Sequence, residues 1–230
     1  MAEFFSAIIL CAGSSTRMGY NKMLLKLGSK TVFERTVEAF ENCEIINEII
    51  IAAPKANVEE YSEIVKKNCY TKVTAVIPGG SSRQESVANA LKEISSECDY
   101  ISVHDGARPL IEEESIALVA QNAIKFGGAV AAVKSVDTLK GVDEDGKIIS
   151  TVDREKTVQV RTPQMFKKEI LLKAHEHAKE DNFEGTDECM LVERLGHGIQ
   201  TVITGRDNVK ITYPEDVLYM TEVLRERGVL

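Results

Sequence analysis

A loop of small residues near the start of the chain contains one arginine and is soon followed by a lysine. It reads Ala12-Gly13-Ser14-Ser15-Thr16-Arg17-Met18-Gly19, and Lys22 lies five residues after Arg17. Backbone N–H groups in such a loop can face phosphate oxygens. Phosphoryl and nucleotidyl transfer depend mainly on positioned cations that neutralise charge growing in the transition state. Arg17 and Lys22 therefore indicate chemistry at phosphorus, although either residue alone would equally suit a solvated surface.

Two common nucleotide-binding loops do not fit this segment. A dinucleotide-dependent oxidoreductase would need G-x-G-x-x-G at the opening of a helix, and a P-loop would need G-x-x-x-x-G-K-[ST]. Neither spacing occurs between Ala12 and Lys22. The loop indicates a different kind of phosphate site.

Two further segments carry polar groups where ligands commonly bind. Gly79-Gly80-Ser81-Ser82 precedes a helical stretch, and Asp105 follows the buried run of residues 100–104. In open α/β sheets, ligands bind at the carboxyl ends of the strands. The same glycines could form a turn, Ser82 could cap a helix, and Asp105 could cap a loop. The residues by themselves leave both interpretations open.

Short β-branched runs alternate with helical stretches along most of the chain. The runs at residues 4–10, 48–53, 72–77, 100–104 and 129–133 are predicted to be buried strands. Thr31 with Glu34 and Ser82 with Glu85 match the Ser/Thr-x-x-Glu capping box that opens a helix. We therefore predict an α/β fold, a Rossmann-like three-layer sandwich with a mainly parallel sheet and helices on both faces.

The pattern changes after residue 134. Residues 138–142 and 148–152 flank a polar, glycine-containing connection, which predicts a β-hairpin that protrudes as an arm over residues 134–155. Helices are expected at residues 168–179 and 187–195, a strand at 199–204 and a last helix opening at Pro214. The whole chain, residues 1–230, is predicted to be one domain.

The length, charge and apolar runs of the chain argue against nucleic-acid and membrane partners. At 230 residues the chain suits one domain, and its net charge of −8 argues against nucleic-acid binding, which needs a basic face. No apolar run approaches the length of a membrane span, so a cytoplasmic protein without membrane contact is expected. Five scattered cysteines without CxxC spacing predict reduced, mostly buried thiols. His175 and His177 are both predicted to lie on a helix surface.

Several motifs together resemble one enzyme family. The loop from Ala12 to Met18 with Lys22 is similar to the signature loop of sugar-phosphate nucleotidyltransferases. The segments that resemble the methylerythritol phosphate cytidylyltransferases within that group are GGSSRQESV at 79–87, HDGARP at 104–109, TVDR at 151–154, RTPQ at 161–164, TDE at 186–188 and DNVKIT at 207–212. They are in register and span nearly the whole chain.

The resemblance implies cytidylyl transfer from CTP to 2-C-methyl-D-erythritol 4-phosphate, a small polyol phosphate, with release of pyrophosphate. The implied catalytic residues are Arg17, Lys22, Arg154 and Lys210. The implied substrate-binding residues are Ala12, Gly13, Gly80, Ser81 and Ser86 for the cytosine, Asp105 and Ala107 for the ribose and metal region, and Arg108, Thr138 and Thr186, with Arg154 and Lys210, for the acceptor phosphate. Arg83 is also implied as a substrate-binding residue. Mg²⁺ or another divalent cation is the implied cofactor, with Asp105 as its protein ligand and the CTP phosphates as its main ones.

The resemblance also implies a homodimer in which the hairpin arm completes the neighbouring site. An isolated two-stranded hairpin needs something to pack against, which favours the same arrangement. Two alternatives stay open: a ribitol-5-phosphate cytidylyltransferase, and a non-catalytic nucleotide-sensing module.

Four positions depart from the family pattern, and one motif has no assigned role. Asn21 and Met23 flank Lys22 where the family often has proline and glutamine, Gly106 stands where alanine is frequent, and Ser81 where an acidic residue is common. None of these removes a charged catalytic group. Thr162-Pro163-Gln164 matches the family, but its residues suggest no function.

Overall fold

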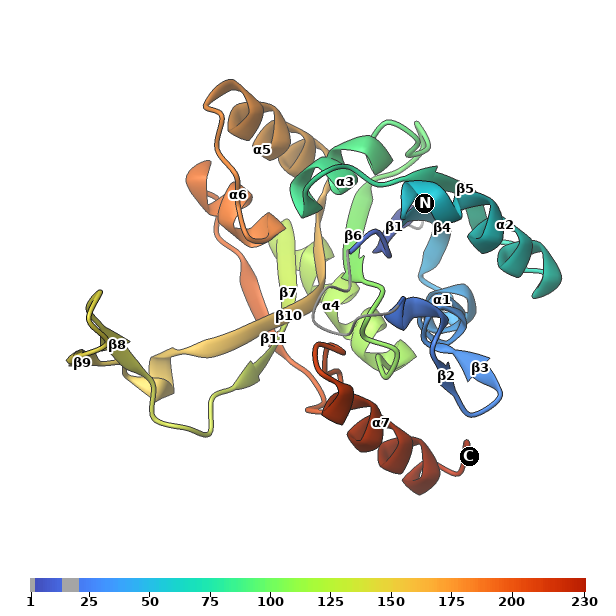
Figure 1. The fold of residues 1–230 in the computed structure, drawn as a ribbon. Helices are drawn as coiled ribbons and strands as arrows, with labels where there is room; N and C mark the ends of the chain where they lie inside the picture. The colour runs from blue at the N-terminus through green and yellow to red at the C-terminus, as the bar shows by residue number, and fades with distance from the viewer. Residues whose placement is uncertain (1–2, 14–20) are drawn as a thin grey trace.

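The computed structural model describes residues 3–13 and 21–230, which build around one seven-stranded sheet (Figure 1). The strand order is β11-β7-β10-β6-β1-β4-β5, and every neighbouring pair is parallel except those made by β10. The strands are β1 (Phe5–Leu10), β4 (Ile46–Ala53), β5 (Val73–Pro78), β6 (Tyr100–Asp105), β7 (Gly128–Lys134), β10 (Val158–Lys167) and β11 (Gln200–Ile203). The five strands expected from β-branched runs and the one expected near residue 200 are confirmed.

Helices cover both faces of the sheet, as predicted. One face carries α1 (Val32–Asn42), α2 (Val58–Lys67), α4 (Glu113–Phe126) and α7 (Pro214–Glu226), and the other carries α3 (Arg83–Ala90), α5 (Lys168–Glu180) and α6 (Glu188–Arg194). Each face of the sheet has its own hydrophobic core, and successive strand residues point into different cores. Ile9 packs in the core beneath α1 and α4, and Ile8 packs in the core beneath α3 and α5. The fold is therefore the predicted three-layer α/β sandwich.

Strand β10 was not predicted. It runs antiparallel between β6 and β7, and its register shifts between Val160 and Gln164. Pro163 lies inside that shift and has no N–H for a ladder, so the run does not look like a central strand. This irregular strand carries the Thr162-Pro163-Gln164 motif into the middle of the sheet.

One predicted capping box is complete and the other is not. At α1, Thr31 Oγ1 accepts from the Glu34 N–H while the Glu34 carboxylate accepts from the Thr31 N–H. At α3, Ser82 Oγ accepts from the Glu85 N–H, but the Glu85 carboxylate accepts from the N–H and hydroxyl of Ser81. The second half of that box is thus displaced by one residue.

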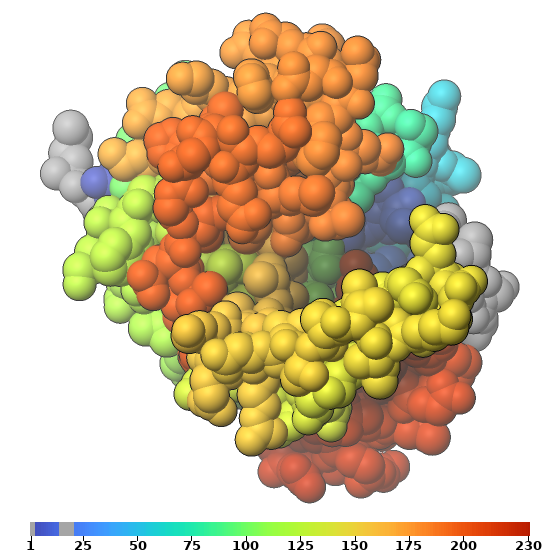
Figure 2. Space-filling model, turned by 90° about the vertical axis from the view of Figure 1, so that its left-hand side faces the viewer, coloured from blue at the N-terminus to red at the C-terminus, as the bar shows by residue number. Residues whose placement is uncertain are grey.

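The predicted hairpin is present as a separate two-stranded sheet of β8 (Lys140–Val142) and β9 (Ile148–Thr151). In Figure 1 it stands away from the body of the molecule. Figure 2 shows it as a yellow ridge below the orange α5–α6 segment, with a hollow between them. The remaining short elements are η1 (Lys22–Leu24), β2 (Lys26–Leu27), β3 (Lys30–Thr31), η2 (Lys55–Asn57) and η3 (Arg154–Lys156).

The expectation for His175 is wrong. His175 is buried because it joins Leu171, Ala174 and Ala178 on the stripe of α5 that faces the core. The cysteines are all free, and only Cys69 is exposed, as predicted for a mostly buried, reduced set. In the part of the chain that the structure describes, no helix is long and apolar enough to cross a membrane.

Candidate functional site

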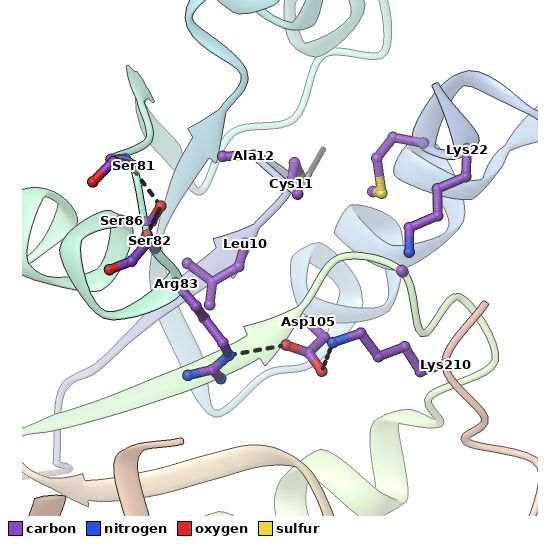
Figure 3. Close-up of a pocket in the computed structure, with 14 residues that line it drawn as sticks. Leu10, Cys11, Ala12, Lys22, Ser81, Ser82, Arg83, Ser86, Asp105 and Lys210 are labelled. Carbon is purple, nitrogen blue, oxygen red and sulfur yellow. Dashed lines mark hydrogen bonds and ion pairs between the residues drawn. The ribbon is translucent and has the colours of Figure 1, made fainter. Parts of the chain in front are cut away.

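A cavity of ≈ 330 Å³ opens at the carboxyl ends of β1 and β6. These two strands are neighbours, and the chain leaves them toward opposite sides of the sheet order, which is where open α/β folds bind ligands. The lining residues are Leu10, Cys11, Ala12, Gly13, Lys22, Met23, Gly80, Ser81, Ser82, Arg83, Ser86, Asp105, Ala107 and Lys210. Figure 3 shows them gathering from segments far apart in the sequence.

One end of the cavity is narrow and uncharged. A Cβ atom on Gly79 would come within 2.3 Å of Ala12 Cβ, so only glycine allows this close approach. Ser86 Oγ accepts from the Gly80 N–H at 3.0 Å and donates to the Ser82 carbonyl oxygen at 2.8 Å. The result is a small slot with fixed polar groups, a shape that suits a planar base.

The other end is built around Asp105, the last residue of β6. Lys210 Nζ lies 3.0 Å from Asp105 Oδ2, Arg108 Nε 3.4 Å from the same oxygen, and Arg83 Nε 3.4 Å from Oδ1. Figure 3 shows Arg83 and Lys210 reaching Asp105 from opposite sides. Three cationic side chains thus contact a single carboxylate. This end of the cavity therefore carries a net positive charge and could bind phosphate.

The charge state of Asp105 follows from these neighbours. Burial by itself would raise the pKa of the Asp105 carboxyl, but Lys210, Arg83 and Arg108 hold its pKa well below the ordinary range. Asp105 is therefore ionised whenever the protein is folded near neutral pH. It remains a hard oxygen donor within the cationic cluster.

Glu188, at the start of α6, holds the far end of Arg83. Both Glu188 carboxylate oxygens lie 2.8 Å from Arg83 Nη1, and Glu188 is only 1% exposed. Burial raises the pKa of Glu188, and the Arg83 guanidinium opposes that rise. Sequence reasoning missed this residue, although it lies in the TDE motif; an acidic residue at a buried helical position was the available signal.

The Thr162-Pro163-Gln164 motif acquires a structural role beneath the cavity. The Thr162 hydroxyl accepts from the Asp105 N–H at 3.1 Å and donates to His104 Nδ1 at 3.1 Å. Burial lowers the pKa of His104 to about 3, so the ring is neutral. His104 Nε2 lies 3.4 Å from the Arg108 carbonyl oxygen, which can only accept, so Nε2 carries the proton and Nδ1 accepts from Thr162. The backbone of Asp105 is thereby anchored to β10.

The segment that carries Lys210 is fastened at several points. Asn208 Nδ2 donates to the Thr162 carbonyl oxygen at 2.7 Å, and Arg108 Nη1 donates to the Asn208 carbonyl oxygen at 2.9 Å. Lys22 Nζ donates to the Ile211 carbonyl oxygen at 2.8 Å. The loops after β1, β6 and β11 are therefore joined around the cavity.

Comparison with known proteins is decisive for the family. The sequence profile of the 2-C-methyl-D-erythritol 4-phosphate cytidylyltransferases matches residues 5–226. A relative of that name from Caldanaerobacter subterraneus subsp. tengcongensis is 38% identical over 224 residues, covering 96% of this chain and 99% of the relative. The chain belongs to this family. A second relative of that name, from Desulforamulus reducens, is 37% identical over 225 residues, 96% of each chain.

Solved structures agree with the methylerythritol phosphate cytidylyltransferase assignment. The 4-diphosphocytidyl-2C-methyl-D-erythritol synthase from Anaerococcus prevotii superposes with a TM-score of 0.88 at 29% identity, covering 97% of both chains. The 2-C-methyl-D-erythritol 4-phosphate cytidylyltransferase from Thermus thermophilus has a TM-score of 0.76 at 27% identity, covering 95% of this chain and 98% of its own. The family expected from the motifs is confirmed.

The cavity brings together most of the residues that the motifs suggested for a methylerythritol phosphate cytidylyltransferase. Its walls include Ala12, Gly13, Lys22, Gly80, Ser81, Arg83, Ser86, Asp105, Ala107 and Lys210, and Arg108 lies directly behind Asp105. Thr138, Arg154 and Thr186 are exposed and do not line it. Arg154 lies in the hairpin arm, at the start of η3 and after β9. Arg17 lies outside the described residues.

Two departures from the family pattern are explained by packing. A Cβ atom on Gly106 would come within 2.7 Å of Cys11 Sγ and 2.9 Å of Met23 Cε. Glycine at 106 therefore accommodates the larger apolar neighbours Cys11 and Met23. Ser81 stands where an acidic residue is common, and a carboxylate lies beside it in the structure: Glu85 accepts hydrogen bonds from the Ser81 N–H and hydroxyl.

The donor set at Asp105 fits a divalent cation that arrives with a nucleotide. Among the described residues, no group of three or more His, Cys, Asp or Glu side chains could hold a metal by itself. Mg²⁺ is commonly bound through one or two carboxylates together with substrate phosphates. Asp105 supplies one ionised carboxylate beside three cations, which favour the accompanying triphosphate.

Proposed function

We propose that the cavity between β1 and β6 is where this enzyme transfers the cytidylyl group of CTP to 2-C-methyl-D-erythritol 4-phosphate, a step in isoprenoid precursor synthesis by the non-mevalonate pathway. The observation that supports this site is the cationic cluster around Asp105 directly beside an uncharged slot. The slot of Gly80 and Ser86 suits cytosine, and the cluster suits the triphosphate. One cavity therefore provides both halves of a nucleotide site.

The proposed reaction is a direct displacement at the α-phosphorus of CTP. A bond forms from an acceptor phosphate oxygen to that phosphorus, and the bond to the bridging oxygen of the β-phosphate breaks, so pyrophosphate leaves. The acceptor phosphate is already anionic and needs no strong general base. Lys22 and Lys210 line the cavity. Lys22, together with Arg17, would neutralise charge on the transferring group, and Lys210 would hold the acceptor phosphate.

Asp105 is the residue that would hold a divalent cation here. When bound, such a cation shields the triphosphate oxygens from the incoming acceptor phosphate and stabilises the leaving pyrophosphate. Lys210 and Arg108 keep the Asp105 carboxylate ionised and oriented toward the cavity. The anchoring of Asp105 by Thr162 holds this group in place.

A homodimer completes the proposal. Val142, Ile148 and Ile149 on the arm are 55%, 65% and 68% exposed. Exposed apolar side chains on a protruding hairpin are typical of interaction surfaces, and a two-fold dimer uses the same surface of both chains. Arg154 and Thr138 are exposed on this arm and outside their own cavity. In the dimer they would reach the acceptor in the partner's site.

The test is pyrophosphate release measured with CTP and a panel of small polyol phosphates, with Mg²⁺ and with excess chelator. We expect turnover with 2-C-methyl-D-erythritol 4-phosphate that depends on the divalent cation. Equal or better turnover with ribitol 5-phosphate would contradict the acceptor. Full turnover in chelator would contradict the metal requirement.

A further inference from the structure

Arg83 lies between two buried carboxylates, which hold it unequally. Nη1 lies 2.8 Å from both oxygens of Glu188, whereas Nε lies 3.4 Å from Asp105 Oδ1. Hydrogen bonds from N–H to oxygen ordinarily measure about 2.7–3.2 Å. Glu188 therefore binds Arg83 firmly, and Asp105 only touches it.

The two oxygens of Asp105 differ as a result. Oδ2 receives Lys210 at 3.0 Å and Arg108 at 3.4 Å, while among the described residues the ion-pair contact to Oδ1 is the long one from Arg83. A guanidinium free to turn would form a two-bond fork with a carboxylate, one of the strongest pairings available to it. The grip of Glu188 prevents that fork.

The distance between the two carboxylates is set by strand β10. Gln164 Nε2 donates to Asp187 Oδ2 at 2.9 Å, and Gln164 Oε1 accepts from the Cys189 N–H at 3.1 Å, which fixes the start of α6 on both sides of Glu188. Thr162, two residues earlier, holds the Asp105 backbone at 3.1 Å. The same short stretch of chain thus positions both partners of Arg83.

We propose that Glu188 is a positioning residue for the transfer reaction: it holds Arg83 back from Asp105 and so leaves Asp105 Oδ1 able to contact the divalent cation that accompanies CTP. This inference rests on the proposed function of the cavity. Glu188 itself is 1% exposed, does not line the cavity and acts only through Arg83. Replacing Glu188 should therefore change the amount by which the divalent cation increases CTP affinity.

The test compares CTP affinity with Mg²⁺ and with EDTA, by calorimetry without acceptor. The gain in affinity on adding Mg²⁺ is the readout. In Glu188→Gln the amide still accepts from Arg83 but carries no charge, so Arg83 turns to Asp105. The gain should shrink by about tenfold or vanish, the usual scale for residues that orient a metal ligand. Affinity in EDTA should change little.

A double variant separates this role from simple packing. In Arg83→Gln/Glu188→Gln the competing cation is absent, so the Mg²⁺-dependent gain should recover, whereas CTP affinity itself should fall in both conditions because Arg83 lines the cavity. The double variant also removes both charges of the buried pair, which protects folding even if Glu188→Gln alone does not fold. Glu193→Gln, on the exposed side of α6, is the matched control and should keep the wild-type gain.

Two outcomes would overturn the inference. One is an unchanged gain in Glu188→Gln, including the case in which affinity falls equally in Mg²⁺ and in EDTA. The other is a double variant that shows the reduced gain. A wild-type enzyme that turns over CTP but whose CTP affinity ignores Mg²⁺ would overturn it together with the metal requirement. Absence of CTP turnover in the wild type would instead defeat the proposed function, and the affinity gain would still decide the role of Glu188.

Discussion

Lys22 Nζ donates a 2.8 Å hydrogen bond to the carbonyl oxygen of Ile211, the residue that follows Lys210. Lys22 opens η1, after the small-residue loop, whereas Lys210 precedes α7, so the bond joins the two ends of the chain. Two lysines are thereby held on the same side of the cavity despite their like charge.

Lys22→Ala should lower kcat by about a hundredfold or more, the usual cost of losing a donor that stabilises charge in the transition state. CTP binding should suffer less, because Arg83 and Lys210 remain in the cavity. Steady-state pyrophosphate release checks this, with the exposed Lys92→Ala as control. A raised KM with near-wild-type kcat would assign Lys22 to ground-state binding.

Thr162→Val should destabilise the protein by about 1–3 kcal/mol, because the buried Asp105 N–H and His104 Nδ1 lose their shared partner. Thr162→Ser keeps the hydroxyl and should retain most of that stability. Urea unfolding of the two variants measures the difference. Equal stability of the valine and serine variants would show that the hydroxyl contributes nothing to the fold.

Mixing inactive Lys22→Ala with inactive Arg154→Ala should restore activity, if Arg154 serves the partner's site. In a mixed dimer one site carries both changes and the other carries neither. Random re-association makes about half the dimers mixed, so about one quarter of wild-type activity should return. Mass measurement must show that mixed dimers formed. Mixed dimers without recovered activity would place the action of Arg154 within its own chain or nowhere.

His175 should make stability depend on pH. Burial, and secondly the charge of Arg83, lower the pKa of His175 to about 4, whereas an unfolded histidine titrates near about 6.5. Between these values the unfolded chain binds a proton that the folded chain does not, so this stabilisation is complete above the unfolded pKa and lost as pH falls. From about pH 7 to about pH 5 the wild type should lose about 1–2 kcal/mol more than His175→Leu.

Denaturant titrations at the two pH values test the claim, with His177→Leu at a half-exposed position of α5 as control. Parallel losses in the wild type and His175→Leu would mean that His175 is not held neutral by the fold.

Local sequence patterns predicted the elements because such patterns depend on neighbours a few residues apart. The β-branched runs of β1, β4 and β6, the capping box at Thr31 and the turn of the arm all follow from this. Strand β10 was not predicted because Pro163 and the shifted register interrupt the usual strand pattern. Its position between β6 and β7 also depends on residues far away in the sequence. His175 was misplaced because a polar residue on the buried stripe of a helix contradicts the usual periodicity.

The α/β class, the order of most elements and, through motifs in register, the family could all be predicted from the amino-acid sequence. Which charged side chains contact one another depends on the three-dimensional fold. Arg83 contacts Asp105 across 22 residues and Glu188 across 105, and Thr162 contacts Asp105 across 57. Each residue type was visible in the sequence, yet the pairings were not. The pairings arise because β10 pairs with β6 and its Gln164 binds the start of α6. These contacts join residues far apart in the sequence, so no local sequence pattern predicts them.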